Sequence, residues 1–256
     1  MADRVVLGGV RSLDPVLRLY LALVAFSILG SVAERALGVD PGPIKPIASA
    51  ATLLAGFAAV ARQAGPMGRW PIVWLFGLGV AVELAGVHTG VPFGRYSYTG
   101  AWPPSVDLPS GESFPLLLPF AWTMIVGAAM LAMPARWPVA GRVVAAAVLA
   151  TAVDFVMEPV MVRELGYWVW HDPFGPFIAP LANAAGWLGT SLAGAAAWGR
   201  VSPSDTRGSV LVLCGHLALM ATIGAMGRPL DLARAALVAG AAALVLLAFA
   251  ECRNAC

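Results

Sequence analysis

Apolar stretches long enough to cross a membrane recur along the whole chain and are separated by short polar segments. A helix needs about 20 residues to span roughly 30 Å of hydrocarbon. Breakers rich in Gly and Pro or in charge occur at 40–43 (DPGP), 65–71 (GPMGRWP) and 202–205 (SPSD), and such clusters interrupt helices. The pattern predicts an all-α polytopic membrane bundle of about eight (seven to eight) helices, as a single membrane domain over 1–256. The expected spans are about 16–36, 44–62, 71–89, 114–134, 141–161, 180–198, 208–226 and 231–250.

Composition supports an integral membrane protein. The chain is 59% hydrophobic and 12% charged, whereas soluble domains carry about 25% charged residues. Its net charge of +2 is scattered, with no basic block, so nucleic acid is not an expected partner. The sequence contains no HExxH, CxxC or GxGxxG motif, so we expect neither a metal nor a cofactor.

The distribution of basic residues predicts the orientation. Ten of the 16 Arg and Lys residues fall on the N-terminal side of the predicted bundle. The six on the other side are Arg35, Lys45, Arg95, Arg163, Arg228 and Arg234. Basic residues favour the cytoplasmic side, so we expect a multi-pass protein of the inner (plasma) membrane with both termini in the cytoplasm. An even number of spans separates the long connections 90–113 and 162–179, so we predict that they meet over the other end of the bundle.

Three carboxylic acids lie inside predicted spans. Asp154 and Glu158 are four residues apart, which is about one helical turn and places both on one face. Glu83 lies alone in the third span. Ionisable groups at membrane depth are costly and usually face the bundle interior, where they serve function. A purely structural role, in which these acids bridge neighbouring helices, is the alternative. Pro159 is expected to kink the end of the fifth span.

Aromatic and basic side chains follow both acidic segments. The loop after Glu83 reads GVHTGVPFGRYSYTG, and the stretch after Glu158 reads PVMVRELGYWVWH. Trp168 and Trp170 would share a face if this stretch is extended. An aromatic belt at the membrane surface, with a snorkelling Arg95, explains these residues equally well.

Two further polar residues occur in apolar context. Asn183, in PLANAAGW at the start of the sixth span, can hydrogen-bond a neighbouring acid or simply join two helices. His216, alone in the seventh span, is interpreted as a packing histidine whose hydrogen bonds are satisfied.

Three blocks together resemble a known family: Glu83 with GVHTGVPFGRYSYTG, MEPVMVRELGYWVW, and PLANAAGW. They look like carotenoid-biosynthesis membrane proteins that include the carotenoid 1',2'-hydratases, among them the γ-carotene and lycopene hydratases of bacteria and the bisanhydrobacterioruberin hydratase of haloarchaea. The resemblance extends from about Glu83 to Trp187. In the family an aspartate often precedes the proline at which this chain has Glu158, so the carboxylate is kept but reaches one methylene farther. Family members differ in substrate.

The resemblance implies a hydro-lyase that adds water to the terminal isoprenoid double bond of an acyclic carotenoid end group, giving a tertiary alcohol. The expected partners are the carotenoid in the bilayer and other enzymes of the carotenoid pathway. Such hydration needs a proton donor that stays neutral, and desolvation of a carboxylic acid favours that form. The tertiary carbocation that follows is stabilised by aromatic faces, by roughly 2 kcal/mol each when desolvated.

The predicted site is a hydrophobic tunnel that opens to lipid and is closed at one end by the acids. Asp154, deepest in the fifth span, is the expected proton donor. Glu83 or Glu158 would orient water, supported by His88 and Asn183. The complete catalytic set is therefore Asp154, Glu83, Glu158 and His88, and the expected substrate contacts are Arg95, Tyr96, Tyr98, Tyr167, Trp168, Trp170, His171, Asn183 and Trp187.

Three other functions remain open at this point. A carotenoid cyclase or isomerase would use the same acid and cation but would exclude water. A small transporter or proton-coupled carrier would use the acids as a relay, although no inverted repeat is visible. A carotenoid-binding scaffold would need none of the acids for chemistry.

Overall fold

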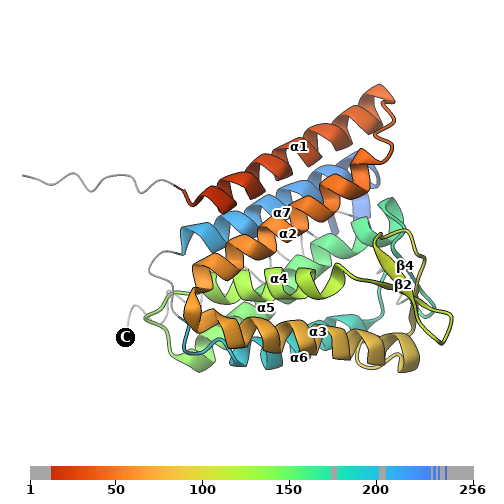
Figure 1. Ribbon diagram of the computed structural model, residues 1–256. Helices are drawn as coiled ribbons and strands as arrows, with labels where there is room; N and C mark the ends of the chain where they lie inside the picture. Colours follow the sequence, from red (N-terminus) through yellow and green to blue (C-terminus); the bar gives the residue numbers. More distant parts are fainter. Residues whose placement is uncertain are drawn as a thin grey trace, which may run out of the picture.

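The computed structural model describes residues 13–173, 178–201 and 206–231, together with 233, 234, 236 and 240. Within these residues the chain is a helical bundle with a small β cap at one end (Figure 1). The helices are α1 (Pro15–Leu37), α2 (Ile44–Ala64), α3 (Arg69–Thr89), α4 (Leu118–Ala132), α5 (Val139–Pro159), α6 (Leu181–Ala196) and α7 (Arg207–Met226).

The helices lie in layers, with α4 at the centre. Figure 1 shows α1 on one side, α2 and α7 next to it, α4 and α5 in the middle, and α3 and α6 on the far side. Helix α4 packs against α2, α3, α5, α6 and α7, and nearly all of its side chains are buried. The most extensive helix pair is α5 with α6, both rich in Ala and Gly. Small residues allow such close approach in lipid, where packing rather than the hydrophobic effect holds helices together.

Within the described residues, five helices are long and apolar enough to cross a membrane, as expected for a membrane protein. They are α1, α2, α3 together with the 3-10 turn η1 (Pro66–Gly68), α5 with the turn that follows it, and α7. Helix α4 is shorter than its predicted span because residues 113–115 form a strand instead of a helical turn. The count of eight spans is not confirmed, and most of the last expected span, 231–250, lies outside the described residues. The orientation expected from charge stays a prediction.

The two long connections meet at one end of the bundle, as predicted. Strand β1 (Tyr96–Tyr98) pairs antiparallel with β4 (Trp168–Trp170), so that Tyr96 is opposite Trp170 and Tyr98 opposite Trp168. Strands β2 (Ser105–Asp107) and β3 (Ser113–Pro115) form a second antiparallel pair. In β4 the two tryptophans are buried and Val169 between them is exposed. This alternation confirms that Trp168 and Trp170 share the inward face.

Helix α5 changes form at Pro159. The chain continues as a single π-helical turn, η2 (Val160–Glu164), since proline cannot donate a backbone hydrogen bond inside a helix. Glu164 forms an ion pair with Arg35 of α1, with an N–O distance of 2.8 Å, and Arg163 forms one with Asp231. These contacts fix the turn, which leads the chain from the end of α5 toward β4.

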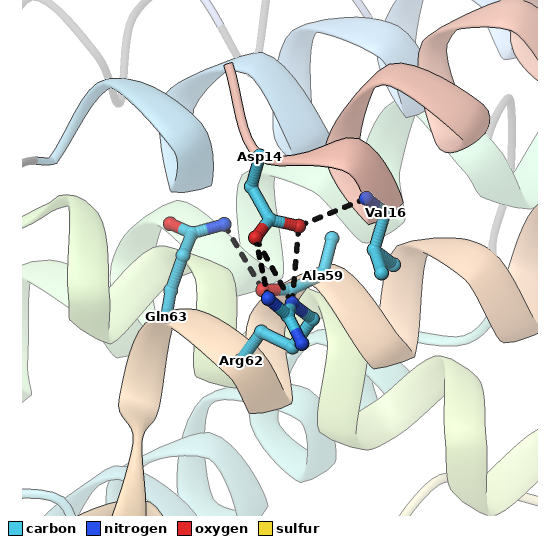
Figure 2. Close-up of polar contacts among 5 residues, drawn as sticks. All are labelled: Asp14, Val16, Ala59, Arg62 and Gln63. Atoms are coloured by element: carbon cyan, nitrogen blue, oxygen red, sulfur yellow. Dashed lines mark hydrogen bonds and ion pairs between the residues drawn. The ribbon is translucent and has the colours of Figure 1, made fainter. Parts of the chain in front are cut away.

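The opposite end of the bundle is joined by polar contacts (Figure 2). Asp14 caps α1 by accepting from the backbone N–H of Val16 at 2.9 Å, and Arg62 in the last turn of α2 donates to the same carboxylate. Gln63, beside Arg62, donates to the carbonyl of Ala59 and accepts from Ser209 of α7. Helices α1, α2 and α7 are therefore tied together at this end.

Candidate functional site

A cavity of about 350 Å³ runs from the middle of the bundle to the α1–α2 connection. Glu83, Asp154 and Glu158 all line it, and each of the three is at least 94% buried. The lining residues that are exposed at the surface all lie between Phe26 and Lys45. The cavity therefore opens at that connection and is closed where the acids and the β cap meet.

Glu83 is held by three neutral donors from two elements, β1 and α4. The hydroxyls of Tyr96 and Tyr98 both donate to Oε2 at 2.7 Å, and the indole N–H of Trp122 in α4 donates to Oε1 at 2.7 Å. Burial, and after it the neighbouring Glu83, raises the pKa of Tyr96 and of Tyr98 above the ordinary value. Both phenols therefore keep their protons and remain donors. Glu83 thus anchors β1 to α3 and α4.

Glu158 is the anchor of the other inward-facing strand. The indole N–H groups of Trp168 and Trp170 both donate to its Oε1, from Trp168 at 3.0 Å. Because β1 and β4 pair, Glu83 and Glu158 hold the two strands of one sheet on the face that is directed into the bundle. The alternation of side chains along a strand explains how two tryptophans can reach one oxygen.

Asp154 has a different environment. It lies one turn deeper in α5 than Glu158, about 6 Å along the axis, and is 2% exposed. Its Oδ2 accepts one hydrogen bond, from the side-chain amide of Asn183 in α6 at 2.9 Å. Its Oδ1 is buried and has no hydrogen-bond partner among the residues that the structure describes. No ion pair within the described residues reaches this carboxyl group or the other two.

Aromatic rings form most of the wall around the acids. Trp122 and Trp187 stack with centroids 3.9 Å apart, and Trp102 stacks on Tyr167 at 5.0 Å nearer the opening. Phe93 lies against Trp122 at 5.9 Å. All five rings line the cavity. Their faces offer an apolar, electron-rich surface, which suits both a polyene and a cation.

Two glycines allow the aromatic wall to approach the helices. A Cβ built at Gly86 would lie 2.6 Å from the Tyr96 hydroxyl, and one at Gly186 would lie 2.5 Å from the ring of Phe93. Both positions have ordinary helical backbone, so the requirement for glycine is one of space. Hydrogen bonding of Tyr96 to Glu83 thus depends on the missing side chain at Gly86.

Three of the predicted site residues lie outside the cavity. His88 is exposed and its Nδ1 contacts the carbonyl of Leu84 in its own helix. Five residues correspond to about 500° of helix rotation, which turns His88 roughly 140° away from Glu83. His171 is also exposed and contacts Ser97 at 2.9 Å.

Arg95 likewise faces outward, where it forms an exposed bidentate pair with Asp172, with N–O distances of 2.8 and 3.0 Å. Arg95 lowers the pKa of Asp172 by donating these hydrogen bonds. The pair therefore links the residues next to β1 and β4 at the surface.

Several cavity residues were not predicted. Trp122 and Phe93 line the cavity, but an isolated aromatic residue in an apolar span or loop carries no distinguishing signal. His216 was expected to be satisfied by packing, yet it lines the cavity and its Nε2 has no hydrogen-bond partner. Within the described residues, no group of three or more His, Cys, Asp or Glu could hold a metal ion.

Comparison with known proteins places this chain in a family. The family model described as "Carotenoid biosynthesis protein" matches residues 47–249, which is most of the chain. The chain belongs to this family. No curated protein and no solved structure matched it. The matched region includes the three acids, the aromatic wall and His216. Membership of the family indicates a role in carotenoid biosynthesis for the chain.

Proposed function

We propose that this protein is a carotenoid hydratase of the 1',2' type, which adds water to the terminal isoprenoid double bond of an acyclic carotenoid. The observation that carries the proposal is Oδ1 of Asp154, a buried carboxyl oxygen without a partner at the wall of an aromatic cavity. Family membership supports the substrate class, since a carotenoid resides in the bilayer to which such a protein belongs.

Asp154 is suited to donate the proton. A buried charge without a paired cation is costly, so the uncharged acid is the form that this environment tolerates. Asn183 already donates to Oδ2, which leaves Oδ1 as the atom that carries the acidic hydrogen. No acceptor within the described residues competes for that hydrogen, so it is available to the less substituted carbon of a double bond in the cavity.

Protonation leaves a tertiary carbocation, which the surrounding rings and acids would stabilise. Trp122, Trp187 and Phe93 present π-systems to the cavity, and each desolvated contact is worth about 2 kcal/mol. Glu83 and Glu158 hold these walls in place through their hydrogen bonds to tyrosines and tryptophans. Preorganised groups of this kind need no rearrangement when charge develops.

The position of the opening supports an elongated, lipid-dissolved substrate. Phe26 and Ile44, on either side of the opening, are 51% and 55% exposed. Other apolar side chains of α1 and α2 are exposed as well. Such a surface faces hydrocarbon in a membrane. A cavity of about 350 Å³ is at the small end of ligand pockets. We therefore propose that it admits one end group while the remaining polyene stays in lipid.

The test is expression of the full chain in a lycopene-producing bacterial host, with mass analysis of the extracted pigments. We expect products heavier than lycopene by one water per reacted end, and tertiary alcohols by their fragmentation. Products of unchanged mass would instead indicate a cyclase or isomerase. A pigment profile identical to that of cells carrying an empty vector would contradict an enzymatic role on this substrate.

A further inference from the structure

His216 is a buried histidine whose side chain lines the cavity from α7. It is 9% exposed, and in the described part of the chain its Nε2 has no hydrogen-bond partner. Buried polar atoms are almost always hydrogen-bonded to protein or to ordered water. A ring nitrogen without a partner at a cavity wall therefore marks a position at which a small polar molecule can bind. None of the hydrogen bonds that hold Glu83, Asp154 and Glu158 involves this residue.

The wall that carries His216 differs chemically from the aromatic wall. Helices α1 and α2, which pack against α7, contribute hydroxyl groups to the cavity, including Ser27 and Thr52, whose oxygens are 3.2 Å apart. Ser31 and Ser49 line the same side closer to the opening. The stacked tryptophans are on α4 and α6. One wall therefore suits water and the other suits a polyene.

The cavity is also lined by one potential proton donor and one potential proton acceptor that lack hydrogen-bond partners within the described residues. Oδ1 of Asp154 and Nε2 of His216 are both buried without partners and both residues line the same space, on helices α5 and α7 that pack against each other. A carboxylic acid can release a proton, and an imidazole nitrogen can accept one. Hydration of an alkene needs these two actions in sequence on a substrate placed between them.

We propose that His216 binds the water molecule that captures the carbocation and accepts its proton. This inference rests on the proposed hydratase function. Asp154 transfers its proton to the less substituted alkene carbon, and the electron pair of the double bond forms the new C–H bond. The water oxygen then bonds to the tertiary carbon, and one of its protons moves to Nε2 of His216. Return of that proton to the Asp154 carboxylate restores both groups, so the net reaction is addition of one water.

The test separates protonation from water capture by using deuterium oxide. Membranes containing the full chain, in either the native form or a variant, are incubated with lycopene in buffered D₂O, and pigments are analysed by mass. The variants are His216→Phe, which removes the nitrogen, and His216→Gln, which keeps a hydrogen-bonding group near the Nε2 position. Cys214→Ala is the matched control, because Cys214 is exposed on the same helix and does not line the cavity.

In His216→Phe we expect the alcohol to fall by about 10²-fold or more, while deuterium still enters the unhydrated carotenoid. A cation that is formed but not captured loses a proton and leaves a labelled alkene. His216→Gln should hydrate more than His216→Phe but less than the native protein, and it should retain deuterium labelling. If the Phe variant fails to insert, the Gln variant alone provides the test.

Hydration in the His216 variants equal to that of Cys214→Ala would overturn the proposal. A parallel loss of deuterium labelling and hydration would overturn it as well, because His216 would then serve protonation or folding. Native membranes that form no alcohol at all would instead contradict the hydratase function, so the two failures are distinguishable. All amounts are expressed per membrane-inserted protein.

Discussion

The side-chain amide of Asn183 donates a 2.9 Å hydrogen bond to Oδ2 of Asp154 across the α5–α6 interface. Because this is the acid's one hydrogen bond within the described residues, it sets the direction in which Oδ1 points. Asn183→Ala should therefore misplace the acid, and a misplacement of about 1 Å can cost roughly 10²-fold in rate. We expect hydration of lycopene by membranes to fall by about 10- to 100-fold. Adding Asn183→Ala to Asp154→Asn should lower hydration no further, and an additive effect would show that Asn183 acts independently.

Replacing the proposed proton donor should abolish most of the chemistry and leave the fold. Asp154→Asn keeps the shape of the side chain but removes the transferable proton, so hydration should decrease by about 10²- to 10⁴-fold. The matched control is Asp107→Asn, an exposed aspartate in β2 that does not line the cavity. Product per membrane-inserted protein is measured for both. Near-normal hydration in Asp154→Asn would assign protonation to another acid, of which Glu83 is the next candidate.

Two glycines of α3 should respond in opposite directions to alanine. Gly86→Ala would force the Tyr96 hydroxyl away from Glu83, since the added Cβ would lie 2.6 Å from it, and overpacking costs about 1–3 kcal/mol. Gly77→Ala meets no atom within 4 Å and should gain about 0.5–1 kcal/mol from helix propensity. Thermal unfolding in one detergent compares them. Equal stability of the two variants would mean that Tyr96 does not need the space.

Removing a donor to Glu83 should loosen the aromatic wall. Tyr98→Phe keeps the ring but deletes the hydroxyl that donates to Oε2 of Glu83 at 2.7 Å. Loss of one buried hydrogen bond of this kind costs about 1–3 kcal/mol, so the unfolding temperature should fall. Tyr167→Phe is a useful comparison, because Tyr167 stacks on Trp102 and makes no hydrogen bond to an acid of the site. A smaller loss in Tyr98→Phe than in Tyr167→Phe would contradict this role for Glu83.

The contact between Asp14 and Arg62 gives a pH-dependent prediction (Figure 2). Hydrogen bonds from Arg62 lower the pKa of Asp14 below 3.8, so the pair stabilises the fold above about pH 4 and loses this effect as the pH falls through the folded-state pKa. The Asp14 side chain is 34% exposed and that of Arg62 is 58% exposed, so the effect on stability should be small and should weaken with salt.

Two substitutions separate the charge of Asp14 from its capping role. Asp14→Asn keeps an acceptor for the N–H of Val16, so it should remove only the pH-dependent part. Asp14→Ala should cost about 0.5–2 kcal/mol more, because the cap is lost too. Unfolding at pH 7 and pH 3 provides the measurement. An unchanged pH dependence in Asp14→Asn would mean that other groups control acid stability.

The sequence alone predicts the helical bundle and the inward acids for clear physical reasons. Burial of Glu83, Asp154 and Glu158 follows from the cost of exposing them to lipid. The meeting of the two long connections follows from the even number of spans between them. Even the bond from Asn183 to an acid could be foreseen, since a lone amide beside an acidic helix has few other partners.

The remaining features depend on tertiary distances that local patterns do not encode. Trp122 becomes a donor to Glu83 only because α3 and α4 pack together, and nothing in its neighbouring residues distinguishes it from a packing tryptophan. The salt bridge of Arg95 with Asp172 joins residues 77 apart. His216 shows the same limit, since an unsatisfied nitrogen is visible only after the surrounding helices are placed. The outward direction of His88, by contrast, can be predicted from the sequence, because five residues of helix turn it away from the buried Glu83.

The position of the cavity opening, at the α1–α2 region, determines how a molecule with two reactive ends would be processed. Its exposed lining residues are confined to the α1–α2 region, and the far end is closed by the acids and the paired strands β1 and β4. A rigid polyene that is inserted end-first cannot turn around inside and must withdraw by the same route. The second end would then be treated in a separate encounter, after release into the bilayer. Turnover would be distributive, and singly hydrated carotenoid would accumulate early in a time course before the doubly hydrated form appears.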